Sequence, residues 1–318
     1  MNWSQTKMIF LVAFLILDVY LGYQLYEKRG ATNPIPSATS NTPPKKALAK
    51  AQIQLPSSLP QETTGTYISG KKMSFVRPGS SEQSGNGNSG KAHSDKKTDK
   101  KNEKVLKPEI LQLEARTQQH IIPENSGKEI YSTFKTPYSI PEQPSADDVT
   151  NFLKKYIYHG TEYRFWKKSS ENTGSSTFIF VQTYKGHPVF SKGNSDTGML
   201  QVYASDGKIT GYRQSYLKLS PFNKKNKKNL INPIKAVDIL YENDDIPKHS
   251  TVKEVALSYF NIIANPEKIR LFGPTWYIVV ETGEKQDKKE FFVNAIKGQI
   301  QTLTPPDQNT EPANGSAK

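Results

Sequence analysis

The sequence predicts an α+β fold in which one N-terminal transmembrane helix and a disordered linker precede two related modules of antiparallel sheet and helix. Three observations predict it: an apolar run near the start, polar low-complexity segments after it, and a helix-and-strand order that occurs twice in the second half. The chain has 318 residues, which is enough for one or two ordinary domains beside unstructured segments. Its hydrophobic fraction of only 35% predicts that the core is confined to part of the chain.

The apolar run covers residues 8–26, MIFLVAFLILDVYLGYQLY, and has the length that spans a hydrocarbon core as a helix. A secretory signal peptide is the alternative, but its apolar region is shorter and ends in a small-residue cleavage site. Lys7 flanks one end, and Lys28 and Arg29 flank the other, so these charges do not set the orientation. The large polar region that follows favours a cell-membrane location, with residues 1–7 as a short cytoplasmic tail and an extracytoplasmic C-terminal region.

Asp18 lies near the centre of the predicted helix, where an acidic side chain costs about 2.5–3.5 kcal/mol. The surrounding Leu, Ile, Phe and Val residues offset this cost, because each contributes roughly 0.3–0.6 kcal/mol. Helical spacing places Asp18 on one face together with Leu11, Phe14, Leu21, Gly22 and Leu25. Since a glycine permits close approach of a second helix, this face is a candidate docking surface. The alternative is that Asp18 is protonated, or reached by water, and merely tolerated.

Polar segments separate this helix from the folded half. Residues 27–65 are rich in Pro, Ser, Thr, Asn and Lys and predict a flexible linker, whereas residues 66–77 predict an outlying strand. Residues 78–107 predict a disordered insert rich in Lys, Ser and Gly, and residues 305–318 a disordered tail. Much of the net charge of +13 lies in lysine clusters without interleaved aromatics or a nucleic-acid-binding motif, which favours anionic lipids or wall polymers over nucleic acid.

The first α+β module is predicted over residues 108–220. A proline-led segment, PEILQLEARTQQH, predicts a helix within 106–120, and Ser145 is placed to cap a second helix over 145–158. Runs rich in aromatic and β-branched residues, separated by turn residues, predict antiparallel strands at 177–182, 189–191, 200–204 and 209–216.

The second module is predicted over residues 221–304 and repeats this order, with a helix after Asn232, strands at 252–259 and 275–281, and a final hairpin. The two hairpins superpose in register, so that Val202, Ala204, Gly207 and Ile209 match Val293, Ala295, Gly298 and Ile300. Residues 177–181 likewise match residues 275–279. The shared glycine supplies the positive φ that a tight turn needs.

The sequence predicts no active site and no cofactor. There is no cysteine, which excludes disulfides, thiolate metal sites and thiol catalysis. The histidines are scattered and none has the spacing of a metal-binding helix, so no metal site is expected. No phosphate-binding glycine loop or nucleophile elbow occurs. Two pairs of adjacent carboxylates are present, but neighbouring side chains on a helix diverge and the second pair lies in a predicted turn: Asp147 with Asp148, and Asp244 with Asp245.

Several segments carry a family resemblance: WSQTKMIFLVAFLILDVYLGYQLYEK, LPSSLPQETTGTYISGK, VQTYKGHPVF, GKITGYRQSYL, NPIKAVDILYEN, PTWYIVV and FFVNAIKGQI. In their order and spacing they resemble the YycI (WalI) regulatory proteins of low-GC Gram-positive bacteria. The resemblance covers the predicted helix and nearly all of the second half. The long insert after Val76 departs from the family, so no role is transferred to it.

The resemblance implies two extracytoplasmic α+β domains related to those of the YycH protein. It also implies two partners, the essential sensor kinase WalK (YycG) of the WalK/WalR (YycG/YycF) two-component system and a YycH-like regulator, in the control of cell-wall metabolism. Contacts in the family are attributed mainly to the transmembrane helices. The positions that match the family's N-terminal pattern are Trp3, Lys7, Phe10, Asp18, Leu21 and Gln24.

Three functions remain open at this point. The first is a non-enzymatic kinase regulator that docks through its helix. The second is an extracytoplasmic module that binds a wall fragment or a protein ligand, with the helix as a mere anchor. The third, an enzyme of wall turnover, is disfavoured because no catalytic motif is present.

Overall fold

The computed structural model describes residues 14, 17, 18, 20, 21, 43–77, 105–141, 146–170, 175–191, 198–223, 226–263, 270–283 and 287–303. These residues are predominantly β-sheet with a few helices, which confirms the predicted α+β class. In the described part of the chain, no helix is long and apolar enough to cross a membrane. The predicted tails at 1–7 and 305–318 lie outside the described residues.

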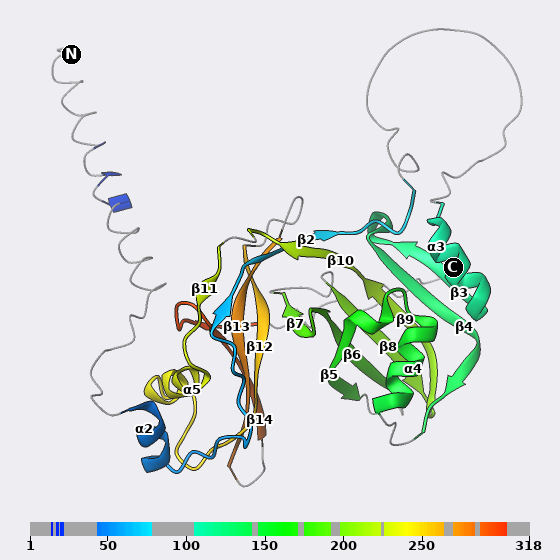
Figure 1. Ribbon diagram of the computed structural model, residues 1–318. Coiled ribbons are helices and arrows are strands. Elements are labelled where there is room, and N and C mark those ends of the chain that lie inside the picture. The colour runs from blue at the N-terminus through cyan, green and yellow to red at the C-terminus, as the bar shows by residue number, and fades with distance from the viewer. Residues whose placement is uncertain are drawn as a thin grey trace, which may run out of the picture.

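The first unit is a sheet with two helices on one face (Figure 1). Its strands pair in the order β5-β6-β8-β9-β4-β3. The predicted helices at 106–120 and 145–158 are confirmed as α3 and α4, whereas β3, β4 and β5 had no predicted counterpart. The elements are α3 (Pro108–Thr117), β3 (Gln119–Glu124), the 3-10 turn η1 (Asn125–Gly127), β4 (Glu129–Ser139), α4 (Ala146–Tyr156), the 3-10 turn η2 (Gly160–Glu162), β5 (Tyr163–Ser170), β6 (Ser175–Tyr184), β8 (Met199–Ser205) and β9 (Lys208–Ser215).

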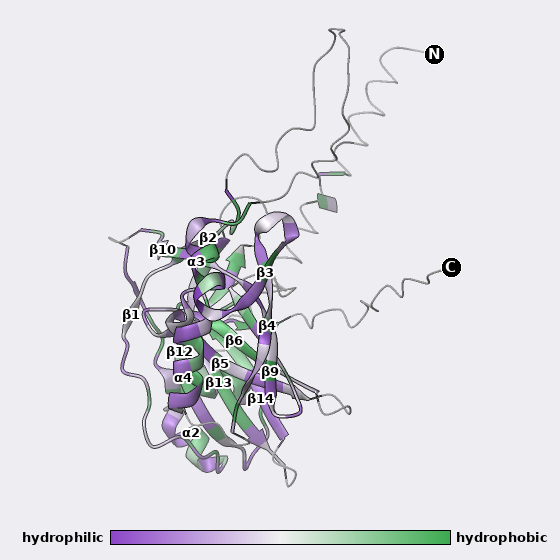
Figure 2. Ribbon diagram, turned by 90° about the vertical axis from the view of Figure 1, so that its right-hand side faces the viewer, coloured by the Kyte–Doolittle hydropathy of each residue, from purple (hydrophilic) through white to green (hydrophobic). Residues whose placement is uncertain are grey.

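The core of this unit forms where α3 and α4 cover the sheet. Ile110 and Leu113 are three positions apart on α3 and are both buried, which is the spacing of one helix face. They share a hydrophobic cluster with Phe152 of α4 and with Leu200 and Tyr212 of the sheet. Figure 2 shows hydrophobic residues concentrated along the strands and hydrophilic residues toward their ends.

The second unit pairs its strands in the order β12-β13-β14-β15 and places α5 against one face. The helix begins where the sequence predicts, because the side-chain oxygen of Asn232 accepts a hydrogen bond of 2.8 Å from the Ile234 amide and Pro233 occupies the first helical position. Its elements are α5 (Pro233–Glu242), β12 (Thr251–Ile263), β13 (Arg270–Thr282), β14 (Asp287–Asn294) and β15 (Ile300–Gln301).

Both faces of the second sheet are covered. Trp276 and Ile278 alternate with Tyr277 along β13, and successive strand residues point to opposite faces. Trp276 and Ile278 belong to the cluster beneath α5, whereas Tyr277 belongs to a second cluster that contains Phe190 of the first half. The central strand of this unit is therefore apolar on both sides.

The pairing of β6 with β8 has the same register as the pairing of β13 with β14, whereas the two hairpins differ, since Ile209 pairs with Ala204 but Ile300 pairs with Val293. Phe178 on β6 lies opposite Val202 on β8, and Trp276 on β13 lies opposite Val293 on β14. These are the positions that the sequence repeat aligns. The turn glycines of the repeat, Gly207 and Gly298, both have positive φ, of 72° and 71°.

Three strands join the units, and Figure 1 shows two of them, β2 and β10, running between them at the top. The β2 strand pairs with β10 on one side and with β13 on the other. The third, β7, pairs with β6 and lies parallel to β12. The bounds are β2 (Ile68–Lys72), β7 (His187–Phe190) and β10 (Leu217–Pro221).

The structure corrects three predictions on segment boundaries. Residues 43–65 are not a flexible linker, because they include α2 (Pro44–Lys50), whose Leu48 is buried, and β1 (Thr64–Gly65), which pairs with β11 (Lys228–Asn229). The strand within 66–77 is not outlying, since β2 has a neighbour on each side. The insert predicted at 78–107 extends too far, because Leu106 is buried and bridges to Val76.

Candidate functional site

The predicted helix-docking residues are only partly within the described chain. Phe14, Asp18 and Leu21 are helical, with exposed side chains, and their i, i+4 and i+7 spacing places them on one face. The remaining predicted residues lie outside the described part: Trp3, Lys7, Phe10, Leu11, Gly22, Gln24 and Leu25.

The segment of residues 43–77, here called the strap, follows the predicted anchor and contacts both units. At its start, α2 packs on α5, and Leu48 and Ala51 lie in the second core. Its middle part forms β1 and β2. At its end, Phe75 enters the first core, where its amide donates to the Gly127 carbonyl (2.6 Å) and its carbonyl accepts from the Lys107 amide (2.8 Å).

Aromatic side chains fill the contact between the two units. Phe190 of β7 packs against Tyr277 and Phe292, with ring centroids 5.1 and 4.9 Å apart. Trp166 lies against Phe190 at 5.4 Å. The Tyr277 hydroxyl donates to the Glu290 carboxylate at 2.8 Å. Burial, together with that carboxylate, raises the pKa of Tyr277 well above its ordinary value.

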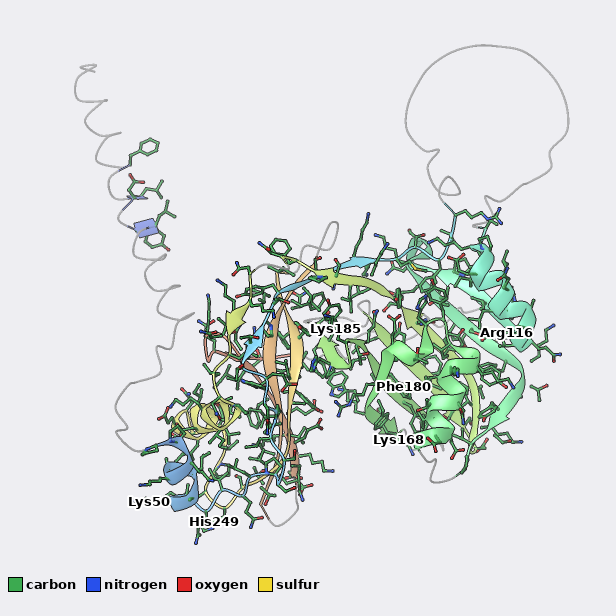
Figure 3. All side chains as sticks on the ribbon, viewed as in Figure 1. Lys50, Arg116, Lys168, Phe180, Lys185 and His249 are labelled. Carbon is green, nitrogen blue, oxygen red and sulfur yellow. The ribbon has the colours of Figure 1, made fainter. Side chains whose placement is uncertain are left out.

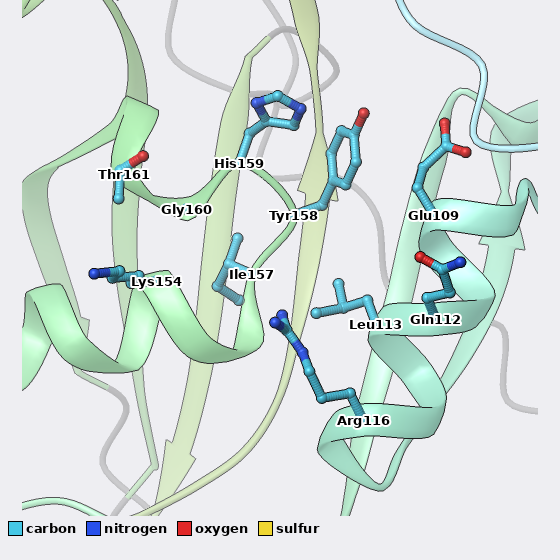
Figure 4. A pocket seen from close by; sticks show the side chains of 10 residues that line it. All are labelled: Glu109, Gln112, Leu113, Arg116, Lys154, Ile157, Tyr158, His159, Gly160 and Thr161. Atoms are coloured by element: carbon cyan, nitrogen blue, oxygen red, sulfur yellow. The ribbon is translucent and has the colours of Figure 1, made fainter.

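A cleft of about 520 Å³ opens between α3 and the C-terminal end of α4 (Figure 4). Its floor is apolar, because Leu113 and Ile157 are buried beneath it. One wall comes from the exposed side of α3, and the other from the last turn of α4 and the turn that follows it. The polar and glycine residues that line it are Glu109, Gln112, Arg116, Lys154, His159, Gly160 and Thr161.

The turn after α4 is held in an uncommon backbone conformation. His159 has a positive φ of 49°, which is rare for a residue other than glycine. Gly160 follows, where an added Cβ would lie 1.9 Å from the Leu153 carbonyl oxygen. His159 Nδ1 is 2.9 Å from Glu162, whose other oxygen accepts a 2.7 Å hydrogen bond from the Tyr216 hydroxyl. These contacts fix the His159 wall of the cleft.

The cleft separates charges of opposite sign. Figure 4 shows Arg116 at the lower centre on α3, Lys154 at the left on α4 and Glu109 at the upper right on α3, with Tyr158 between His159 and Glu109. Burial and the nearby Glu109 carboxylate raise the pKa of the Tyr158 hydroxyl above its usual value, so this group stays neutral. Figure 3 places Arg116 at the periphery of the first unit, whereas Phe180 lies at its centre.

The described residues provide no evidence for catalytic chemistry. No group of three or more His, Asp or Glu side chains there could hold a metal ion. Trp276 and Tyr277 are buried residues of the strand predicted at 275–281. Burial, and secondarily Asp244, raises the pKa of Asp245, but the two carboxylates lie in the turn after α5.

Sequence reasoning missed both the strap and the cleft. A signal for the strap was available, since Pro43 and Pro44 precede the alanine-rich KKALAKA with Leu48 on one side. For the cleft, the i, i+3, i+4 and i+7 spacing of Glu109, Gln112, Leu113 and Arg116 indicated one helix face with mixed polarity.

Comparisons with known proteins extend these observations. None of the curated proteins matches the chain. Among solved structures, an uncharacterised protein from Eubacterium rectale is 12% identical, with a TM-score of 0.43, and the match covers 80% of this chain and 91% of that one. The C-terminal domain of YpeB from Bacillus megaterium is 16% identical, with a TM-score of 0.33, and the match covers 63% of this chain and 98% of that one.

The family model described as YycI protein matches residues 33–296. This match covers well over half of the 318 residues and includes the strap, the first unit with its cleft, and the second unit except β15. The chain therefore belongs to the YycI protein family.

Proposed function

We propose that this protein is a non-enzymatic, membrane-anchored regulator of a WalK (YycG)-like sensor histidine kinase that controls cell-wall metabolism. Membership of the YycI family implies a regulatory role in the WalK system rather than an enzymatic one. In the proposal, residues 8–26 span the cell membrane once, with a cytoplasmic N-terminus, and contact the kinase and a YycH-like regulator. We further infer that the two units are copies of one ancestral helix-and-sheet module, because the β6–β8 and β13–β14 pairings share one register.

The observation that carries the proposal is the attachment of the strap to both units. The strap begins at residue 43, shortly after the predicted span, and its first helix is fixed to α5 through buried Leu48. The strap therefore ties the chain that follows the predicted span to both units of the folded region. A regulator of this kind shifts the kinase between signalling states by binding one state better than the other.

The candidate contact face carries Phe14, Asp18 and Leu21. Asp18 is the feature that distinguishes it from an ordinary anchor, since an acidic side chain in a bilayer is costly unless it is paired with a polar group. A photo-reactive residue at position 18 is expected to crosslink to the kinase or to the YycH-like protein in native membranes. The same residue at position 20, which lies about 200° round the helix from position 18, faces the other side and serves as the matched control.

Replacing residues 8–26 with an unrelated span of equal length tests the mechanism. The expected result is loss of regulation of a WalK-controlled reporter while the protein remains in the membrane. Retained regulation would show that the helix is a mere anchor, and would support the second candidate, an extracytoplasmic module that binds a wall fragment or a protein. Protease treatment of intact cells tests the topology, and a fully resistant C-terminal region would contradict it.

A further inference from the structure

We propose that the cleft between α3 and α4 binds a short peptide, with Arg116 and Lys154 holding its C-terminal carboxylate and Glu109 holding its N-terminal ammonium group. The inference goes beyond the proposed function, because it concerns a ligand of the first unit and needs neither the membrane anchor nor the kinase.

The three charged side chains that line the cleft are positioned to contact a ligand. Arg116, Lys154 and Glu109 are all exposed, and none of them forms an ion pair with another described residue. The Nη2 atom of the Arg116 guanidinium approaches the Lys155 carbonyl at 3.5 Å, which is at the long limit for a hydrogen bond. Most of its donors therefore remain for a ligand.

The arrangement of the charges selects the ligand class. A guanidinium presents a planar fork of donors that matches a carboxylate, and Lys154 supplies a second cation from the facing wall, on α4. Glu109 lies on the same wall as Arg116 but two turns away along α3, where it repels a dianion such as phosphate but attracts an ammonium group. Opposite charges at two ends favour a zwitterion.

The space between the charges suits small apolar side chains. The floor is formed by Leu113 and Ile157, and the ring of Tyr158 lies beside them. The Gln112 amide and the Thr161 hydroxyl can hydrogen-bond peptide groups. The volume of about 520 Å³ is within the usual size range of small-ligand sites.

The cleft is also formed in advance of binding. The positive φ of His159 and the close approach of Gly160 to Leu153 hold the turn in a conformation that most residues avoid. Backbone conformations of this kind are concentrated at ligand sites and are kept only when their surroundings enforce them. Here the hydrogen bonds through Glu162 to His159 and Tyr216 provide that enforcement.

Calorimetric titration of the full-length protein in lipid nanodiscs, with trialanine as the probe, tests the inference. Arg116→Gln and Lys154→Gln are each expected to weaken trialanine binding by about tenfold or more, as the loss of a charge-assisted hydrogen bond does. Trialanine amide is expected to bind the unchanged protein as weakly as trialanine binds the Arg116→Gln variant. Arg116→Gln should not weaken the binding of trialanine amide any further. Lys155→Gln, on the same helix but outside the cleft lining, is the control and should bind as the unchanged protein does.

A second comparison tests recognition of the N-terminal ammonium group of the ligand. N-acetyl-trialanine should bind more weakly than trialanine, and Glu109→Gln should remove that difference. The proposal is overturned if trialanine does not bind, if its amide binds equally well, if Arg116→Gln leaves binding unchanged, or if inorganic phosphate binds more tightly. None of these outcomes depends on kinase regulation, so the failure of either proposal leaves the other standing.

Discussion

The indole Nε1 of Trp166 donates to both carboxylate oxygens of Glu290, at 2.9 and 3.1 Å, and so links β5 of the first unit to β14 of the second. The same carboxylate accepts a hydrogen bond from Tyr277, which is buried between the units. Arg164 forms a further link across the boundary, an ion pair of 2.7 Å with Glu254. Side-chain contacts thus reinforce the strand pairing that joins the units.

Glu290→Ala is expected to lower the free energy of unfolding by about 1–3 kcal/mol, because it leaves the buried Tyr277 hydroxyl and the Trp166 indole without their acceptor. Chemical denaturation of the purified protein measures this. Glu254→Ala, which removes the ion pair with Arg164 between the two units, is the matched control. Its ion pair is largely exposed, so its loss should cost at most about 1 kcal/mol. Equal effects of the two substitutions would contradict the assignment.

Leu48→Ala is expected to destabilise the protein by roughly 2–5 kcal/mol and to release α2 from α5. Leu48 is fully buried in the second core, and removal of its side chain leaves a cavity. Hydrogen exchange at residues 44–51 is the direct measurement and should become fast. Lys45→Ala, on the exposed side of the same helix, should change stability by no more than about 0.5 kcal/mol. Unchanged protection in Leu48→Ala would mean that other contacts hold the strap.

The parts of the fold that could be predicted are those whose signals are local. The Asn232 cap, the alternation of Trp276 and Ile278, and the turn glycines at 207 and 298 are each encoded within a few residues. The strands β3 and β4 carry a weaker pattern: on β4, buried Ile130, Ser132 and Phe134 alternate with half-buried residues, and the run ends in mostly exposed ones.

The candidate site depends on long-range packing. Periodicity shows that Arg116 shares a helix face with Glu109, but it does not show which helix lies opposite. Lys154 approaches this face because both helices cover one sheet, whose pairing of β4 with β9 is set by residues far away in the sequence. The position of the strap likewise depends on β2 having a neighbour on each side, which no local pattern reveals.

Two glycine substitutions are expected to differ in their effects. In Gly160→Ala, the new Cβ would meet the backbone of Leu153, which cannot move without breaking the end of α4. The expected cost is about 3 kcal/mol or more, at the upper end for overpacking. In Gly207→Ala, nothing lies within 4 Å of the new Cβ, so only the positive φ of 72° is penalised, at about 1 kcal/mol. Thermal unfolding of both variants measures the difference, and similar melting temperatures would contradict it.

The pH dependence of stability should report on Asp245. Burial, and secondarily Asp244, raises the pKa of Asp245 in the folded state above its unfolded value. The folded protein therefore binds this proton more tightly, so the carboxylate destabilises the fold at neutral pH and this penalty disappears as the pH falls through the folded pKa. Asp245→Asn should raise the melting temperature at pH 7 and leave it nearly unchanged at pH 3. A gain of the same size at both pH values would exclude this origin.

Disruption of strand β2 tests whether the strap couples the two units. Ser69 lies opposite Ser220 on β10 and Leu271 on β13, so a proline there removes a ladder hydrogen bond in a strand that has neighbours on both sides. Ser69→Pro is expected to cost about 3 kcal/mol or more. Ser69→Ala removes only the side-chain contacts to Ser220 and should cost about 0.5–1.5 kcal/mol.

The structural effect of Ser69→Pro can be measured because the natural chain contains no cysteine. Spin labels on cysteines introduced at the exposed Lys135 and Lys248 report the distance between the units. The distribution is expected to broaden in Ser69→Pro and to remain narrow in Ser69→Ala. If it remains narrow in Ser69→Pro while stability falls, then the β7–β12 pairing and the Trp166–Glu290 hydrogen bonds suffice to fix the units. The anchor would then act on the second unit alone, through α2 and α5.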